Sequence, residues 1–94
     1  MTLSIIIPHY NSPVFLKVLL DSIGHYDDTQ IIVVDDHSTK ETEKYQALKS
    51  DPAYAYVTFV SNQDGKKGAG SARNTGLKLA QGKYLMFCDA DDYL

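Results

Sequence analysis

The 94-residue sequence has one cysteine, few basic residues and no long apolar run, and these shortages exclude several classes of protein. A single cysteine, Cys88, cannot form an internal disulfide, which excludes a disulfide-stapled secreted module and leads us to expect a cytoplasmic location. The longest apolar run near the start, residues 3–8, is interrupted by Ser4. It is too short for the core of a signal peptide or for a membrane span.

The charge balance argues against a sequence-independent nucleic-acid binder. Nine Lys and Arg against 12 Asp and Glu give a formal net charge of -3, whereas such proteins need a basic surface. We therefore expect no nucleic-acid partner. A local basic group formed by Lys66, Lys67 and Arg73 is nevertheless suited to phosphates.

Length and composition indicate one small folded domain. The chain is 44% hydrophobic and 22% charged, which is ordinary for a globular protein. It stops just after an apolar run that is followed by three carboxylates within residues 89–92. A natural domain rarely ends there, so we expect residues 1–94 to be a single truncated domain.

Four apolar runs predict strands, and helical patterns lie between them. The runs are residues 3–7, 31–34, 56–60 and 84–88. Three of them are rich in β-branched residues and almost continuously hydrophobic, which is typical of parallel strands covered on both faces. The alternation predicts an α/β fold with three layers, α/β/α, around a mainly parallel, Rossmann-like sheet.

Local signals set the expected helix boundaries. The first predicted helix has Ser12 as its N-cap, begins at Pro13, buries Phe15 on its apolar face and ends at Gly24. The second predicted helix begins at a capping box formed by Ser38 and Glu41 and ends near Lys49. The third covers about residues 70–80 and places Leu79 on its apolar stripe.

In open parallel sheets, ligands bind beyond the carboxyl ends of the strands. Asp89 and Asp91 follow the fourth run, one residue apart, so both could reach Mg²⁺ or Mn²⁺, which prefer oxygen ligands. Such a metal would neutralise a diphosphate leaving group. An acidic turn at the start of a helix explains the same spacing, and spacing alone does not decide between the two.

Two other segments also allow a binding role and a structural role. Asp35 and Asp36 follow the second run, where a carboxylate could accept hydrogen bonds from a ribose or a base, or could mark a helix start. Residues 68–76 combine small residues with Arg73, which suits either a phosphate at a helix N-terminus or close helix–sheet packing. The segment is neither a Rossmann fingerprint nor a Walker A loop.

Four segments, in order, resemble the sequential motifs of family-two glycosyltransferases, which have the GT-A fold. They are residues 4–11 (SIIIPHYN), 31–38 (IIVVDDHS), 70–76 (GSARNTG) and 82–92 (GKYLMFCDADD). One such motif would be weak evidence, but four in order span nearly the whole chain. The resemblance implies the nucleotide-sugar-binding half of an enzyme that transfers a sugar, usually from a UDP-sugar, to an acceptor hydroxyl with inversion.

The resemblance also implies roles for particular residues. Pro8, Tyr10 and Asn11 match a loop that borders the nucleoside, and Asp36 matches the residue that contacts the base, usually uracil. Arg73 matches an arginine near the nucleotide.

Asp89 and Asp91 match the Asp-x-Asp motif, in which Asp89 contacts the ribose and the metal and Asp91 coordinates the divalent metal, Mn²⁺ or Mg²⁺. The family's catalytic base and acceptor-binding half lie downstream of this motif. The resemblance therefore implies no catalytic residue within these 94 residues, and we expect the chain alone to be inactive. A saccharide or lipid-linked acceptor would bind the missing part, in the biosynthesis of a polysaccharide or glycoconjugate.

Two other enzyme classes fit parts of the pattern but fail on position. A response-regulator receiver needs its acidic pair after the first strand, and a haloacid-dehalogenase-type phosphatase needs its Asp-x-Asp there. A non-catalytic nucleotide-binding or assembly module remains an alternative. An apolar surface or sheet edge left uncovered in a truncated domain would favour a homodimer.

Overall fold

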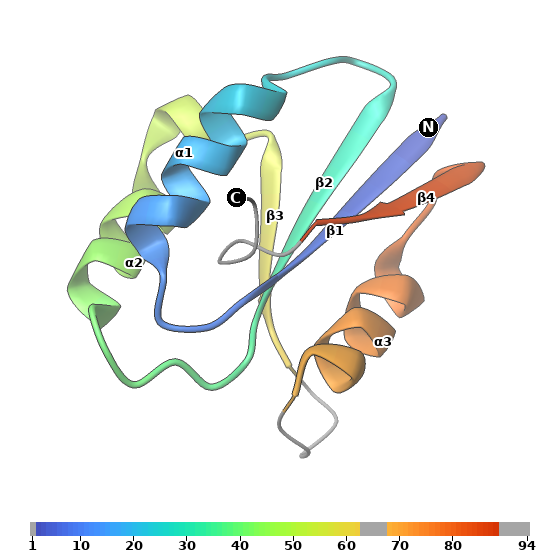
Figure 1. Cartoon of the computed structure of the whole chain (residues 1–94). Helices are drawn as coiled ribbons and strands as arrows, with labels where there is room; N and C mark the ends of the chain where they lie inside the picture. The colour runs from blue at the N-terminus through green and yellow to red at the C-terminus, as the bar shows by residue number, and fades with distance from the viewer. Residues whose placement is uncertain (1, 63–67, 89–94) are drawn as a thin grey trace.

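Strands and helices alternate along the chain. The computed structural model describes residues 2–62 and 68–88. The elements in chain order are β1 Leu3–His9, α1 Pro13–Ile23, β2 Thr29–Asp35, α2 Thr42–Ser50, the short 3₁₀ helix η1 Pro52–Tyr54, β3 Val57–Ser61, α3 Ala69–Leu79 and β4 Tyr84–Phe87 (Figure 1). None of the described helices is long and apolar enough to cross a bilayer.

The four strands form one parallel sheet in the order β3-β2-β1-β4. Helices α1 and α2 cover one face and α3 covers the other (Figure 1). This arrangement confirms the predicted three-layer α/β/α fold. All strands run the same way, and β1, β2 and β3 end at one edge of the sheet, which is the lower edge in Figure 1.

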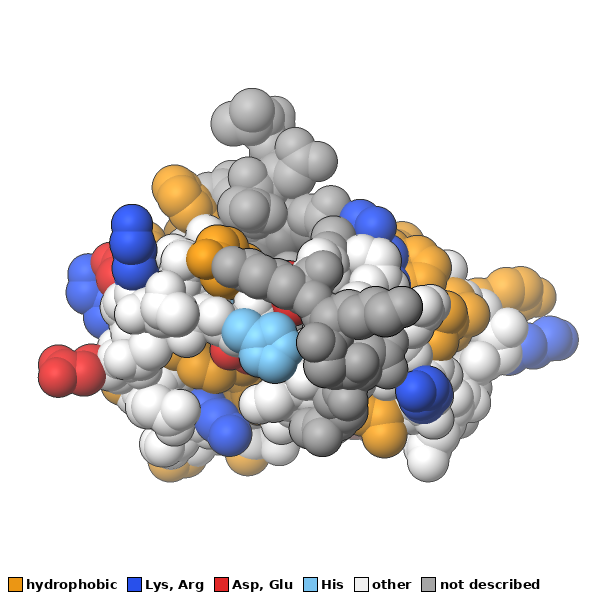
Figure 2. Space-filling view, turned by 90° about the horizontal axis from the view of Figure 1, so that it is seen from below, with side chains coloured by type: hydrophobic (Ala, Val, Ile, Leu, Met, Phe, Trp, Pro, Cys, Tyr) orange, Lys and Arg blue, Asp and Glu red, His pale blue; other side chains and the backbone are white. Residues whose placement is uncertain are grey.

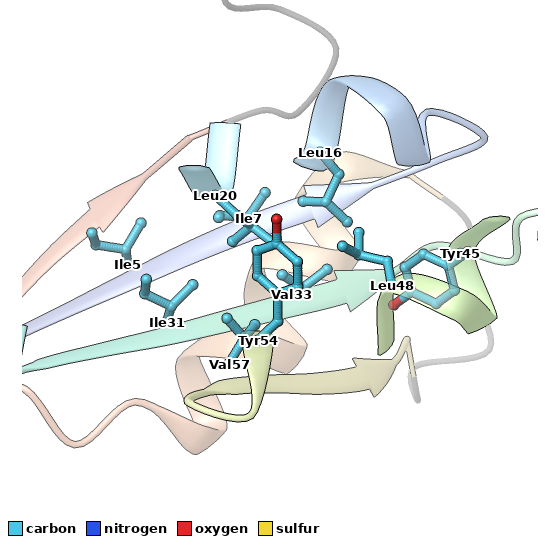
Figure 3. Close-up of a cluster of buried hydrophobic side chains, with 10 residues drawn as sticks. All are labelled: Ile5, Ile7, Leu16, Leu20, Ile31, Val33, Tyr45, Leu48, Tyr54 and Val57. Atoms are coloured by element: carbon cyan, nitrogen blue, oxygen red, sulfur yellow. The ribbon is translucent and has the colours of Figure 1, made fainter. Parts of the chain in front are cut away.

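The core consists of two clusters, one on each face of the sheet. On the face of α1 and α2, ten side chains pack together (Figure 3): Ile5, Ile7, Leu16, Leu20, Ile31, Val33, Tyr45, Leu48, Tyr54 and Val57. On the opposite face, the alternating residues Ile6, Ile32 and Val34 pack against Ala72 of α3. Successive residues of a strand point to opposite faces, which is why β1 and β2 are apolar at almost every position.

Helix α1 has the predicted boundaries, but the Ser12 hydroxyl donates to the carbonyl of Tyr10 and makes no capping bond. The helix begins at Pro13 and is followed by Gly24, whose φ of 75° is a left-handed value that glycine adopts without strain. The burial of Phe15 was predicted wrongly, since the side chain is 49% exposed. Leu16 and Leu20 face the sheet. Phe15, which precedes Leu16, points about 100° away from this direction around the helix axis.

The predicted start of α2 is also wrong. The helix begins at Thr42, and Glu41 before it has a left-handed φ of 55° and makes no capping bond. The hydroxyl of Ser38 donates to Asp35 instead of capping the helix. A hydrogen bond to the end of β2 therefore replaces the predicted capping box.

Leu79 is more exposed than predicted, and β4, whose burial the sequence pattern did not predict, is exposed along its whole length. Leu79, in the last turn of α3, is 42% exposed. All four side chains of β4 are exposed, from Phe87 at 42% to Tyr84 at 59%. Within the described residues β4 pairs only with β1 and forms the edge of the sheet.

Helix α3 approaches the sheet so closely at Gly76 that no side chain fits there. A Cβ atom added at Gly76 would lie 2.4 Å from Cγ2 of Ile6, which is fully buried in β1. In the same helix, a Cβ added at Gly70 would meet nothing within 4 Å. The small residues of α3 therefore serve close packing at Gly76 and not at Gly70.

This difference predicts opposite effects of two alanine substitutions in one helix. Gly76→Ala should destabilise the chain by about 1–3 kcal/mol, because the buried Ile6 must move. Gly70→Ala, the matched control, should stabilise it by up to about 1 kcal/mol through helix propensity. Urea unfolding of the two variants measures both changes. Equal stability of the two variants would contradict the packing argument.

Candidate functional site

The carboxyl edge of the sheet collects most of the polar side chains that the sequence singled out. β1, β2 and β3 end there at His9, Asp35 and Ser61, and α3 begins there. Figure 2 looks onto this edge, where the described surface shows mainly neutral polar groups with a histidine and acidic atoms near its centre. The edge is therefore polar but not strongly charged among the described residues.

The ends of β1 and β2 are joined by a part-buried hydrogen bond between an imidazole and a carboxylate. His9 and Asp35 are register partners in the parallel ladder. Nδ1 of His9 lies 2.9 Å from Oδ1 of Asp35, with side-chain exposures of 0% and 16%. On its other side, Nε2 of His9 accepts the backbone N–H of Ser12 at 3.0 Å. The His9 ring also stacks on Tyr45 of α2, with centroids 4.8 Å apart and planes at 8°.

Asp35 also organises the loop that follows β2. Its carboxylate accepts the hydroxyl of Ser38 at 2.5 Å and the backbone N–H of Ser38 at 3.1 Å. Burial raises the pKa of Asp35, but the hydrogen bonds from His9 and Ser38 outweigh it, so the pKa is lowered from its ordinary value. Burial, with a contribution from Asp35, raises the pKa of the Tyr45 hydroxyl, which is therefore neutral beside the carboxylate.

Asn11 ties the loop after β1 to the loop after β2. Its backbone N–H donates to the Ser38 hydroxyl oxygen at 2.9 Å. Its side-chain Oδ1 accepts the N–H groups of Thr39 and Lys40 at 2.8 and 2.9 Å. Asn11 has a left-handed φ of 54°, a conformation that asparagine tolerates better than most residues. The two loops form one hydrogen-bonded unit.

Asp36 is buried and joins β2 to the start of α3. One carboxylate oxygen accepts Nδ2 of Asn62 at 3.0 Å, and the other accepts the backbone N–H of Gly68 at 2.8 Å. Asn62 is itself buried, and its Oδ1 accepts the hydroxyl of Thr75 in α3 at 2.9 Å. This second network fixes the N-terminal end of α3 at the same edge.

Arg73 of α3 reaches toward the end of β4. Its guanidinium carbon lies 5.9 Å from the centre of the Phe87 ring. The backbone N–H of Cys88 donates to the carbonyl of Ile6 at 3.0 Å, so the pairing with β1 continues to the last described residue. A basic side chain is therefore held beside the strand that leads to the Asp-x-Asp motif.

Of the ten positions that the sequence singled out, the structure brings six to one edge or its immediate surroundings, whereas Lys66 and Lys67 lie outside the described residues. Pro8 is buried in β1 and Tyr10 beyond it is 36% exposed. Asn11, Asp35, Asp36 and Arg73 take part in the contacts above. Asp89 and Asp91 lie outside the described residues. The predicted roles of Asp89 and Asp91 stay predictions, as do those of the six positions at the edge.

Sequence reasoning missed two buried residues of these networks. The sequence assigns no role to His9, which stands between Pro8 and Tyr10, or to Asn62. The signal for His9 was available in principle, because it and Asp35 both end apolar runs and would meet once the strands were aligned. The partners of Asn62 could not be read from its neighbours in the sequence.

The side chains at this edge show which residues could coordinate a metal ion. Among residues 2–62 and 68–88, no three His, Cys, Asp or Glu side chains converge as a metal site. The carboxylates of Asp89 and Asp91 provide the hard oxygen donors that suit Mn²⁺ or Mg²⁺ together with phosphate oxygens. A metal site would therefore depend on these two residues.

Comparison with known proteins adds independent information. Residues 4–94 match the family described as Glycosyl transferase family 2. The chain is 34% identical over 98 residues to the poly(ribitol-phosphate) beta-N-acetylglucosaminyltransferase TarS of Staphylococcus aureus, covering 100% of this chain and 17% of that protein.

Solved structures agree with the sequence match. A crystal structure of S. aureus TarS in complex with UDP has a TM-score of 0.80 and 31% identity, covering 99% of this chain and 28% of that one. A mannosyltransferase from Pyrobaculum calidifontis in complex with GDP-Man and Mn²⁺ has a TM-score of 0.76 and 28% identity, over 95% of this chain and 27% of that one. The 94 residues thus span less than a third of each of these proteins.

The lowered pKa of Asp35 predicts how acid affects stability. A carboxyl group whose pKa is lower in the folded state stabilises the fold above about pH 4 and loses that contribution as the pH falls through the folded pKa. Asp35→Asn should therefore cost about 1–3 kcal/mol at pH 7, and its deficit relative to the wild type should shrink below about pH 4.

Urea unfolding at pH values from 7 to 3 measures this deficit. Asp27→Asn is the control, because Asp27 is exposed in the turn before β2. A deficit for Asp35→Asn that stays constant across this range would show that its charge does not stabilise the two loops.

Proposed function

Because the chain belongs to glycosyl transferase family 2, we propose that it forms the donor-binding part of a glycosyltransferase. The protein would transfer a sugar from a nucleotide-diphospho-sugar, most simply a UDP-sugar, to an acceptor hydroxyl with inversion. The observation that carries the proposal is the likeness over 99% of the chain to a TarS structure in complex with UDP. The matched part is 28% of that structure, so we assign the catalytic base and the acceptor site to residues outside these 94.

We assign the nucleoside to the joined loops after β1 and β2. Tyr10 offers a partly exposed ring at this edge, and the backbone beside it is held by Asn11 and Ser38. Asp36 lies deeper, with both carboxylate oxygens already accepting one hydrogen bond each. Each oxygen retains a second lone pair, so a base N–H could still be accepted there.

We assign the diphosphate to the space between the start of α3 and the end of β4. Arg73 supplies positive charge beside Phe87, and guanidinium groups bind phosphate oxygens in a bidentate manner. Asp89 and Asp91 would hold a divalent metal, which, when bound, neutralises the charge of the diphosphate leaving group. The Mn²⁺ in the P. calidifontis complex supports this assignment.

The expected location and product class are part of the same proposal. A cytoplasmic site of action suits a donor-binding domain with a single cysteine, which cannot form an internal disulfide. The name of TarS, which concerns poly(ribitol-phosphate), supports a role in polysaccharide or glycoconjugate synthesis. The identity of the sugar and the acceptor would be decided outside these 94 residues.

The donor assignment predicts metal-dependent nucleotide binding. Titration of UDP into the chain in the presence of Mn²⁺, followed by calorimetry, should show saturable binding that EDTA abolishes. Asp91→Ala should weaken the binding at least about tenfold, because a carboxylate ligand of the metal is lost. Arg73 would contribute through phosphate contacts that do not need the metal.

Asp27→Ala is the control, since this exposed carboxylate lies outside the proposed site. It should leave the affinity for UDP unchanged. Binding that persists without metal and is unaffected by Asp91→Ala would refute the metal assignment. Preference for a nucleotide without a diphosphate would refute the donor assignment as a whole.

The exposed edge strand favours a second activity, self-association of the chain. We propose that two copies of these 94 residues associate through β4, where four apolar side chains are exposed and, among the described residues, only β1 pairs with the strand. Strand edges with apolar side chains readily pair with other strands.

Sedimentation velocity over a range of concentrations tests this association. The wild-type chain should show a growing dimer fraction, and Met86→Lys should reduce it, because a charge on an edge strand opposes pairing. Val18→Lys, at a similarly exposed apolar position on α1, is the control and should have little effect. A wild-type chain that remains monomeric throughout would rule out the dimer.

A further inference from the structure

We propose that His9, held as one tautomer, is a positioning residue for the nucleoside-binding loop of residues 10–12. The inference rests on the proposed function, because the loop matters for catalysis only if a nucleoside binds it. The resemblance assigns Pro8, Tyr10 and Asn11 and leaves position 9 open. The geometry gives this open position a specific task.

The partners of the ring determine its protonation. The backbone N–H of Ser12 can only donate, so Nε2 of His9, which lies 3.0 Å from it, must be an unprotonated acceptor. A neutral imidazole then carries its proton on Nδ1. That N–H donates to Oδ1 of Asp35 at 2.9 Å. Both ring nitrogens are thus used, each in a defined role.

The orientation of the ring is fixed as strictly as its protonation. The His9 side chain is 0% exposed and lies flat against Tyr45, whose ring in turn meets Phe59 of β3 edge-on at 6.0 Å and 83°. Rotation of the imidazole would disturb the packing of α2 on the sheet. The ring is therefore a rigid support in contact with β2 and α2 and hydrogen-bonded to Ser12, the residue before α1.

This support sets the far end of the loop of residues 10–12. The near end is the end of β1, and the far end is Ser12, whose carbonyl accepts the N–H of Leu16 in the first turn of α1. Between them, Asn11 has a left-handed φ and is held by Ser38. With both ends and the centre of the loop held, the backbone direction at Tyr10 is determined.

A histidine that only fills space in the core would behave differently. Its nitrogens would be interchangeable, and any side chain that preserved the fold would preserve binding. A positioning role requires the acceptor toward Ser12 in particular. Two amide variants separate the nitrogens, because an asparagine amide reaches about as far as Nδ1 and a glutamine amide about as far as Nε2.

The test compares His9→Asn with His9→Gln. His9→Asn can still donate to Asp35 but cannot reach Ser12, and His9→Gln can accept from Ser12 but loses the bond to Asp35. With Mn²⁺ present, the Kd for UDP should rise about tenfold in His9→Asn, the equivalent of one lost hydrogen bond. It should rise no more than about threefold in His9→Gln. Urea unfolding of both variants shows whether stability follows the same order.

A stability loss that is equal in the two variants, combined with unequal affinities, would support positioning over packing. Equal affinities of the wild type and His9→Asn would overturn the proposal while leaving UDP binding, and hence the proposed function, intact.

A second measurement needs no nucleotide, and its first part, on the wild-type chain, needs no variant. The ¹⁵N chemical shifts of the His9 ring should report protonated Nδ1 and unprotonated Nε2. The amide of Ser12 should exchange slowly in the wild type, and faster in His9→Asn than in His9→Gln. An Nε2–H tautomer, or equal exchange in the two variants, would overturn the proposal even if UDP did not bind at all.

Discussion

The parallel register between β1 and β2 is the constraint on which the rest of the structure depends. It places His9 opposite Asp35 at the end of both strands, so that an imidazole and a carboxylate meet in the interior. From this pair the hydrogen bonds spread to Ser12 and Ser38 and fix the two loops that follow. A shift of one residue would turn the apolar side chains of β1 to the wrong faces and separate the pair.

The carboxyl edge therefore consists of two rigid networks with different chemistry. The first, around Asp35, joins the starts of α1 and α2 and holds a partly exposed tyrosine beside them. The second, around Asp36, joins β2, β3 and α3 and is almost wholly buried. Asp35 and Asp36, which are adjacent in the sequence, thus belong to different networks. Arg73 extends from α3, which the second network holds, toward β4. Such pre-organisation suits a site that must orient a nucleotide without moving.

The sequence was sufficient for the order of the four strands and the three α-helices, because their signals are local. Runs of Ile and Val mark β1 and β2, and Pro13 and Gly24 delimit α1. Prediction failed where other partners, near or distant in the sequence, replaced the predicted one. Ser38 is a good capping residue, but Asp35 and Asn11 engage its hydroxyl, so α2 begins four residues later. The position of the polar edge could be predicted from the ends of the strands. The hydrogen bonds of His9 and Asn62 could not be predicted, because they depend on the strand register and on the packing of α3.

The carboxylate of Asp36 accepts hydrogen bonds from the residues on both sides of residues 63–67. One oxygen holds the side chain of Asn62 before this segment, and the other holds the backbone of Gly68 after it. Asn62 and Gly68 are thus brought together by one carboxylate, and these two hydrogen bonds do not involve the chain between them. Since the entropy of closing a loop grows only with the logarithm of its length, about 0.6 kcal/mol per doubling, related proteins could lengthen this segment at little cost. The fold contains a natural place for evolutionary insertions next to its proposed ligand.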